Sequence, residues 1–178
     1  MQFEPNTILN KAYGCINVKV GDEHKVANMI HSIFPEVETC VVKQVKHRSR
    51  QGIKTYIYDI MLPGYILFYT KEDAPVSQFM RITSVQHIVI YDDSKWHLRG
   101  DDLFYAKWVF DNKGTIGISD VFIENDEIVI NEGPLKDMKG RIIRIDKRNR
   151  NALVSLGFRQ QSFNVWLAFE WMKGAVNH

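Results

Sequence analysis

The feature that most constrains the fold is a change of pattern between residues 111 and 120. Before this segment, stretches with apolar residues at helical spacing alternate with β-forming apolar runs. After it, only short apolar runs separated by turn residues remain. The segment itself holds Gly114 and Gly117 and few large apolar side chains, which is typical of a linker. The pattern therefore predicts a domain over residues 1–110, a linker over 111–120 and a second domain over 121–178.

The first part of the chain predicts an α+β domain, in which helices pack on one antiparallel sheet. Strands are expected over 14–20, 38–45, 55–61, 65–69 and 87–91, and helices between Asp22, a candidate N-cap, and Pro35 and over 75–82 and 103–110. Residues 47–54 are polar and basic and contain Gly52, so we expect an exposed hairpin loop there.

The second part of the chain predicts a small β-barrel. Short strands are expected over 127–130, 140–145, 152–156 and 163–167, with turn residues between them. The predicted fold class is thus α+β followed by a small barrel.

Composition and charge restrict the class of function. Among 178 residues, 45% are hydrophobic and 25% charged, and no apolar run approaches the roughly 20 residues of a membrane span. The N-terminus lacks a signal-peptide pattern and the cysteines are only Cys15 and Cys40, so we expect a reduced cytoplasmic protein without a membrane partner.

Basic residues gather in two places. Residues 136–159 contain eight basic and two acidic residues, although the net charge of the whole chain is only +2. A second basic run without acids consists of Lys43, Lys46, Arg48, Arg50 and Lys54. Such local asymmetry indicates a polyanion as partner, and the alternative is a solvated charged surface.

The most specific motif is residues 131–146, which follow the apolar run 127–130. Gly133 suits a backbone with positive φ, Pro134 initiates a turn, and Gly140 lets the chain reverse before the next strand. With its basic residues, the segment resembles the KOW motif of NusG-family transcription factors and of several ribosomal proteins. The resemblance implies an SH3-like barrel, and the alternative is an ordinary β-turn.

A second motif, Leu62-Pro63-Gly64-Tyr65-Ile66-Leu67, resembles the Pro-Gly signature of the NusG N-terminal (NGN) domain. Together with residues 13–18 and 21–26, the resemblance covers about residues 13–172. It implies docking onto the clamp helices of the largest RNA polymerase subunit through Tyr13, Leu62, Pro63, Gly64 and Tyr65, and contact of the facing lobe through Thr83 and Ser84. Tyr13 stands where a tryptophan is usual and Leu62 where an aromatic is usual. A core position in the sheet is the alternative for Tyr65.

The basic second part is similar to LoaP-type antiterminators, a branch of the family whose KOW domain recognises RNA hairpins. The implied RNA-binding residues are Lys136, Lys139, Arg141, Arg144, Lys147, Arg148 and Arg150. Two alternatives stay open. The domain could bind a ribosomal protein or a termination factor, as in general NusG-like adaptors, or the chain could be a ribosome-associated KOW protein.

Catalytic motifs are not found in the sequence. The cysteines lack Cys-x-x-Cys spacing, the histidines lack His-Glu-x-x-His spacing, and there is no Gly-rich phosphate loop and no Gly-x-Ser-x-Gly elbow. We therefore expect a protein that binds without catalysing a reaction and without a cofactor or metal.

Overall fold

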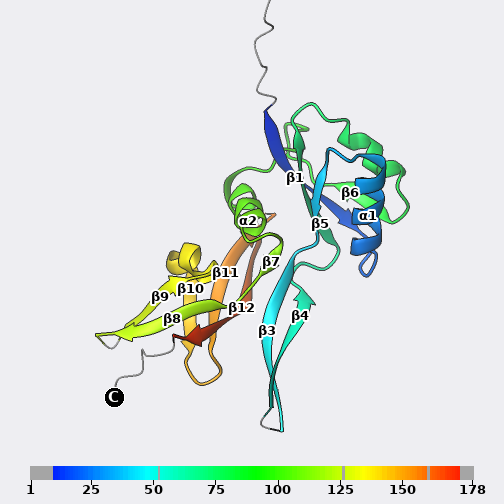
Figure 1. The fold of residues 1–178 in the computed structure, drawn as a ribbon. Helices are drawn as coiled ribbons and strands as arrows, with labels where there is room; N and C mark the ends of the chain where they lie inside the picture. Colours follow the sequence, from blue (N-terminus) through cyan, green and yellow to red (C-terminus); the bar gives the residue numbers. More distant parts are fainter. Residues whose placement is uncertain (1–9, 52, 126, 160, 173–178) are drawn as a thin grey trace, which may run out of the picture. The chain divides into compact units, whose positions relative to one another are not determined.

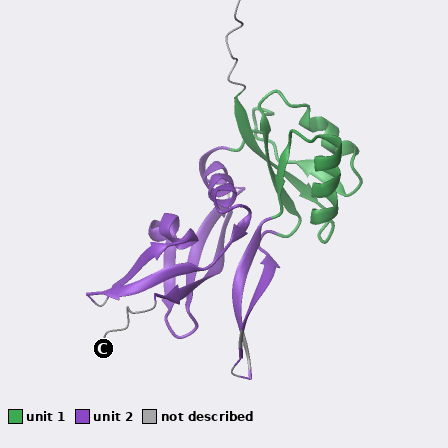
Figure 2. Cartoon of the chain, in the orientation of Figure 1, with its two compact units in different colours: residues 1–41, 63–98 green, residues 42–62, 99–178 purple. Residues whose placement is uncertain are grey.

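The computed structural model describes residues 10–51, 53–125, 127–159 and 161–172. These residues form two compact units (Figure 2). Unit 1 consists of residues 1–41 and 63–98, and unit 2 of residues 42–62 and 99–178. Each unit thus takes two separate stretches of the chain, and each is described by itself below.

Unit 1 contains a four-stranded antiparallel sheet in the order β2-β5-β1-β6 (Figure 1). Its strands are β1 (Lys11–Val18), β2 (Glu38–Cys40), β5 (Tyr65–Lys71) and β6 (Val85–Ile88). Its helices are α1 (Glu23–Ile33) and the 3₁₀ helix η1 (Val76–Arg81). Helix α1 buries Val26, Ala27 and Ile30, so the apolar spacing in the sequence marks its inner face.

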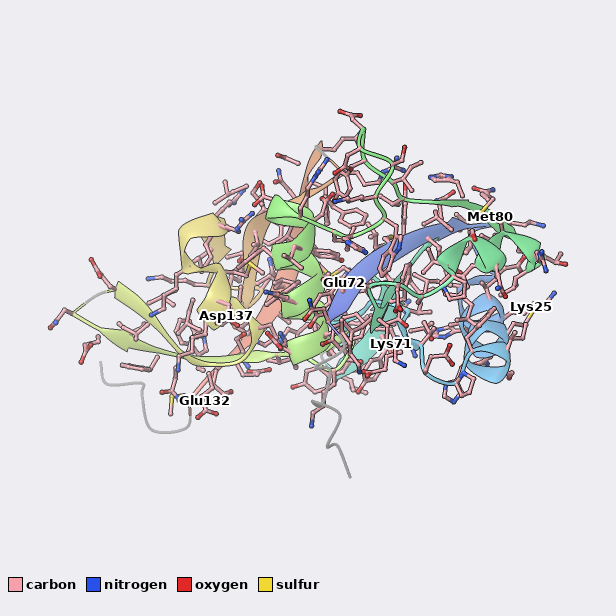
Figure 3. The ribbon with its side chains drawn as sticks, turned by 90° about the horizontal axis from the view of Figure 1, so that it is seen from above. Lys25, Lys71, Glu72, Met80, Glu132 and Asp137 are labelled. Atoms are coloured by element: carbon pink, nitrogen blue, oxygen red, sulfur yellow. The ribbon has the colours of Figure 1, made fainter. Side chains whose placement is uncertain are left out.

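The core of unit 1 is built around Phe68 on β5, which is fully buried. Its ring meets Phe79 of η1 edge-on at a centroid distance of 5.4 Å, and Phe79 in turn meets Phe34 at 5.3 Å. Gly14 on β1 makes room for this ring, because a Cβ at that position would lie 2.1 Å from the Phe68 Cζ. Residues Lys25 of α1 and Met80 of η1, labelled in Figure 3, are exposed.

Unit 2 contains a five-stranded sheet in the order β10-β11-β12-β8-β9. The strands are β8 (Ser119–Glu124), β9 (Glu127–Glu132), β10 (Ile142–Asp146), β11 (Asn151–Phe158) and β12 (Gln161–Trp171). All neighbours are antiparallel except β12 and β8, which are parallel. The 3₁₀ helix η2 (Pro134–Arg141) joins β9 to β10, and helix α2 (Gly100–Asp111) belongs to the same unit.

A smaller sheet completes unit 2, in the order β4-β3-β7. Strands β3 (Lys43–Arg50) and β4 (Ile53–Ile60) form a long hairpin, and β7 (Thr115–Ile116) pairs parallel with β3. The prediction of a loop over 47–54 is wrong, because strand pairing continues to Arg50 opposite Ile53. Strand β4 is rich in β-branched and aromatic residues, which favour extended pairing along its whole length.

The α+β fold class with antiparallel sheets is confirmed. The expected helices are confirmed at 23–33 and 100–111, whereas η2 occupies part of a segment for which only a turn and a strand were predicted. The predicted linker contains β7 and the start of β8, and α2 groups with the second sheet. The compact units therefore divide the chain at points other than residues 110 and 120. The assignment of residues 1–110 to an NGN-like domain and of residues 121–178 to a barrel domain stays a prediction.

Candidate functional site

The Pro63-Gly64 turn lies at one end of the unit 1 sheet, between the segment that ends at Leu62 and strand β5. Gly64 has a φ of +79°, which favours glycine over other residues. Its N–H donates to Glu23 Oε1 at 2.8 Å, and its carbonyl accepts from the Val18 N–H at 2.8 Å and from Asn17 Nδ2 at 2.9 Å. The turn is therefore fixed by hydrogen bonds at both peptide groups that flank the Gly64 Cα.

Glu23 is the residue that holds this turn, and the sequence analysis missed it. The side chain is 1% exposed, and its second oxygen, Oε2, accepts from the Gly21 N–H at 2.8 Å. A buried carboxylate is tolerated only when such bonds replace water, and its place at the start of α1 also favours negative charge. Glutamate directly after the Gly-Asp pair at a helix start was the available signal.

The turn at Thr83 and Ser84 is tied to the same end of the sheet. Ser84 has a φ of +79°, its Oγ donates to Asp22 Oδ2 at 2.6 Å, and its carbonyl accepts from the Lys19 N–H at 2.9 Å. Asp22 makes no side-chain cap bond to α1, because its carboxylate binds Ser84 instead. The end of β1, the loop after it and the start of α1 thus bind both predicted polymerase-binding turns and bring them to one end of unit 1.

Tyr13 lies away from that end. It pairs with Tyr69, whereas Tyr65 pairs with Asn17, four residues further along β1, or about 13 Å at strand rise. The rings of Tyr13 and Tyr69 stack at a centroid distance of 4.5 Å, and the Lys11 ammonium lies 4.8 Å from the Tyr69 centroid. Tyr13 and Tyr65 are half-buried and share one face of the sheet. Leu62, also half-buried, belongs to unit 2.

The Gly133-Pro134 turn in unit 2 joins β9 to η2. Gly133 has a φ of +95°, and a Cβ there would lie 2.6 Å from the Ser119 Cα, so no other residue fits without moving backbone. The Ser119 hydroxyl accepts from the Leu135 N–H at 2.9 Å, and the Trp108 indole N–H donates to the Pro134 carbonyl at 3.1 Å. The glycine and proline of the predicted motif therefore have defined structural roles.

The predicted RNA-binding residues fall into two sets. Lys136 and Lys139 on η2, Arg144 on β10, and Lys147 and Arg148 in the β10–β11 turn are exposed. Within the part of the chain that the structure describes, none of these side chains forms an ion pair. An acidic residue, Asp137, lies between the two lysines on η2 and is also exposed (Figure 3). Lys136 and Lys139 precede β10 along the chain, and Lys147 and Arg148 follow it.

Arg141 and Arg150 form the second set, because both contact acidic residues. Arg141 Nη2 lies 2.7 Å from Asp101 Oδ1 of α2, and its guanidinium lies 4.5 Å from the centroid of Phe104. Arg150 forms an ion pair with Glu170 of β12. An RNA phosphate would have to displace these carboxylates to reach either arginine.

Glu170 connects three elements of unit 2. Besides Arg150, its carboxylate accepts from the Tyr56 hydroxyl at 3.2 Å, and His47 Nε2 lies 3.6 Å from its Oε1. Loss of solvent, followed by the negative charge of Glu170, raises the pKa of Tyr56. The cluster joins the β3–β4 hairpin to β12, which gives Arg150 a structural role. The side chains of Arg50 and Lys54 lie outside the described part of the structure.

Among the described residues, no group of three or more histidine, cysteine or acidic side chains could hold a metal ion. In the same residues, no helix is both long and apolar enough to cross a membrane.

Comparisons with known proteins gave likenesses to solved structures only. No protein-family model matches the chain, and no curated protein matches it significantly. A solved structure that describes domain interaction in Thermotoga maritima NusG is similar over 89% of this chain and 94% of its own, with 18% sequence identity and a TM-score of 0.49. Such a likeness does not define what this chain binds, and the contacts described above have to support a functional assignment.

Proposed function

We propose that this chain is a cytoplasmic, non-enzymatic transcription elongation and antitermination factor of the NusG type, without a cofactor. An NGN-like domain would bind the clamp helices of the largest RNA polymerase subunit, and a KOW-type SH3-like barrel would bind an RNA hairpin. The two weak contacts would strengthen each other, because one raises the local concentration of the other.

The observation that carries the proposal is the fixed Gly133-Pro134 turn followed by exposed cations without ion pairs. Lys136, Lys139, Arg144, Lys147 and Arg148 lie on short, well-connected elements of one sheet domain. Cations on a rigid support can neutralise phosphates at little entropic cost beyond the ordering of their own side chains. The A-form stem of an RNA hairpin is contacted mainly at its backbone, and the unpaired bases of the loop or bulge supply sequence information.

Polymerase binding is supported by the end of unit 1 that holds the two fixed turns. Pro63 and Thr83 are exposed there, and Tyr65 is half-buried. A partner that covers these side chains would bury apolar area without first ordering the turns, because Glu23 and Asp22 already hold them. Clamp binding of this kind would act by favouring one polymerase conformation.

The test is transcription by purified RNA polymerase through a hairpin terminator, with and without the full chain. The template encodes a second, upstream RNA hairpin in one version and a scrambled segment of equal length in the other. We expect more readthrough with the chain, and a larger gain when the upstream hairpin is present. Equal termination with and without the chain on both templates would contradict the proposal.

Direct RNA binding separates hairpin recognition from attraction by charge. The full chain is titrated with labelled hairpin and with linear RNA of the same composition at several salt concentrations. Selective hairpin binding at physiological salt is expected. Weak binding that is equal for both RNAs and lost at moderate salt would instead favour the alternative adaptor, whose barrel binds a ribosomal protein or a termination factor.

A further inference from the structure

The outer face of the unit 2 sheet carries a row of three side chains that the sequence motifs did not include as a group. Strand register places Arg144 of β10 opposite Leu153 of β11, and Leu153 opposite Trp166 of β12. The neighbours of Trp166 along β12, Val165 and Leu167, are buried, so Trp166 points outward. The row spans two strand spacings, or about 10 Å.

Trp166 is exposed, although leaving a large apolar ring in contact with water is unfavourable in free energy. Its exposed fraction is 38%, and the adjacent Leu153 is half-buried. Ile143, at the irregular pairing beside Arg144, is 56% exposed. A large aromatic ring thus lies in an apolar strip with a guanidinium at one end.

Polar groups border this ring on the next row. Ser155 of β11 is paired with Asn164 of β12, and both share the outer face with Trp166. Asn164 is exposed and Ser155 half-buried. An amide and a hydroxyl beside an exposed ring are the groups that hydrogen-bond to base edges while the ring stacks on the base.

The charge at the β10 end of this row is positive. Asp146 shares the face of β10 with Arg144, and its carboxylate already accepts from the Asn149 N–H at 2.9 Å and from Asn149 Nδ2 at 2.8 Å. Lys147 and Arg148 follow directly in the exposed turn. An anionic partner with flat, apolar faces matches this combination better than an acidic peptide, whose side chains offer the ring nothing to stack on.

We propose that Trp166 stacks on an unpaired nucleotide of the bound RNA, with Arg144 holding a neighbouring phosphate. This inference rests on the proposed RNA binding and adds the class of RNA: a hairpin with an accessible loop or bulge, since paired bases cannot reach the ring. Stacking on an aromatic side chain is sequence-tolerant, so the polar groups of Asn164 and Ser155 would supply preference among bases.

The test measures RNA affinity of the full chain by fluorescence anisotropy at several salt concentrations. The probes are a stem-loop with an unpaired adenine- and uridine-rich loop and a blunt duplex with the same stem. The variants are Trp166→Leu, Trp166→Phe and Arg144→Ala, with Tyr58→Leu as control for removal of an exposed aromatic outside the five-stranded sheet. Thermal unfolding verifies that each variant folds.

We expect Trp166→Leu to weaken stem-loop binding about five- to 100-fold, the range measured when a stacking side chain is lost, with an unchanged salt slope and unchanged duplex binding. Trp166→Phe retains most of the affinity, and Tyr58→Leu changes nothing. Arg144→Ala lowers affinity for both probes and reduces the salt slope by about one.

Each contrary result overturns a different statement. If the wild-type chain binds neither probe at physiological salt, the proposed RNA recognition fails and the role of Trp166 fails with it. If the wild type prefers the stem-loop and Trp166→Leu binds it equally well, only the stacking role is wrong. If the wild type sediments as a dimer that Trp166→Leu converts to a monomer, a second copy covers this face and the RNA role of Trp166 is wrong.

Discussion

Two turns in this molecule use the same residue pair in opposite orders, Pro63-Gly64 in unit 1 and Gly133-Pro134 in unit 2. Both glycines have positive φ, and both turns are fixed by hydrogen bonds to a neighbouring element. They differ in what they expose. Pro63 is exposed, whereas Pro134 and the following Leu135 are buried. The first turn is thus a surface available to a partner, and the second is an internal support for the cations that follow it.

The two turns also differ in how they are held. Gly64 depends on the buried carboxylate of Glu23, and a Cβ at Gly64 would come no closer than 3.2 Å to a side-chain atom, Val20 Cγ2. Gly133 depends on close contact, because the Ser119 backbone fills the space where a Cβ would be. A glycine–proline motif by itself therefore predicts a turn, while the surrounding contacts decide whether that turn is exposed or enclosed in the fold.

The largest effect is expected for Gly133→Ala. The added Cβ meets backbone at 2.6 Å in a strained conformation, so we expect a loss of about 3 kcal/mol or more in the free energy of unfolding. Chemical denaturation of the full chain measures it, with Gly140→Ala as control, since a Cβ there meets nothing within 4 Å. Equal stability of the two variants would mean that Gly133 is not tightly enclosed.

Glu23→Ala tests the hydrogen-bonded turn of unit 1. The change leaves the N–H groups of Gly21 and Gly64 without their charged acceptor, which we expect to cost about 2–3 kcal/mol in unfolding free energy. Glu23→Gln keeps an acceptor oxygen and should cost less. Chemical denaturation gives both values, and a neutral effect of Glu23→Ala would show that the turn is held by packing.

Much of unit 1 could be predicted from sequence, because the information is local there. The spacing of Val26 and Ile30 marks α1, and Pro35 follows its end. The bonds of Glu23 to residues 2 and 41 positions away could not be predicted, since they join loops that only the complete sheet brings together. The hairpin over 43–60 was misjudged for a related reason: polar residues at its tip looked like a loop, and pairing across the two strands decides the outcome.

For the candidate site, the sequence identified the cations but not their partners. Arg141 and Arg150 look the same in sequence as Arg144 and Arg148, yet the first two meet Asp101 and Glu170 in the fold. Asp101 lies 40 positions from Arg141. Trp166 was not noticed because its row with Arg144 exists only through the register of three strands.

The Lys147→Ala, Arg148→Ala double variant probes the exposed cations. Both side chains are exposed and without ion pairs in the described structure, so stability should stay within about 0.5 kcal/mol of wild type. RNA affinity should fall roughly fivefold or more at physiological salt, and the salt slope should decrease by about 1–2, as phosphate contacts are lost. Anisotropy titrations measure both quantities.

The Arg150→Ala variant should instead reduce stability, because Glu170 loses its partner.

Asp146→Asn should have the smallest effect. Hydrogen bonds from Asn149 lower the pKa of Asp146 in the folded chain, so its stabilising contribution is complete above its ordinary pKa of about 3.9 and disappears as pH falls through the lower folded value. The Tm difference between wild type and variant should therefore be small at about pH 6 and shrink further towards about pH 3. A difference that grows on acidification would contradict this assignment.

The most direct test of the account is binding of the full chain to purified RNA polymerase, measured by anisotropy of a fluorescently labelled chain. Three proteins are compared: wild type, Tyr65→Ala beside the exposed turn, and the Lys147→Ala, Arg148→Ala double variant. The account predicts that the wild type and the double variant bind alike and that Tyr65→Ala binds at least about tenfold more weakly while remaining folded. Absence of wild-type binding, or equal binding of all three proteins, would contradict polymerase docking through the turn at Pro63 and Gly64.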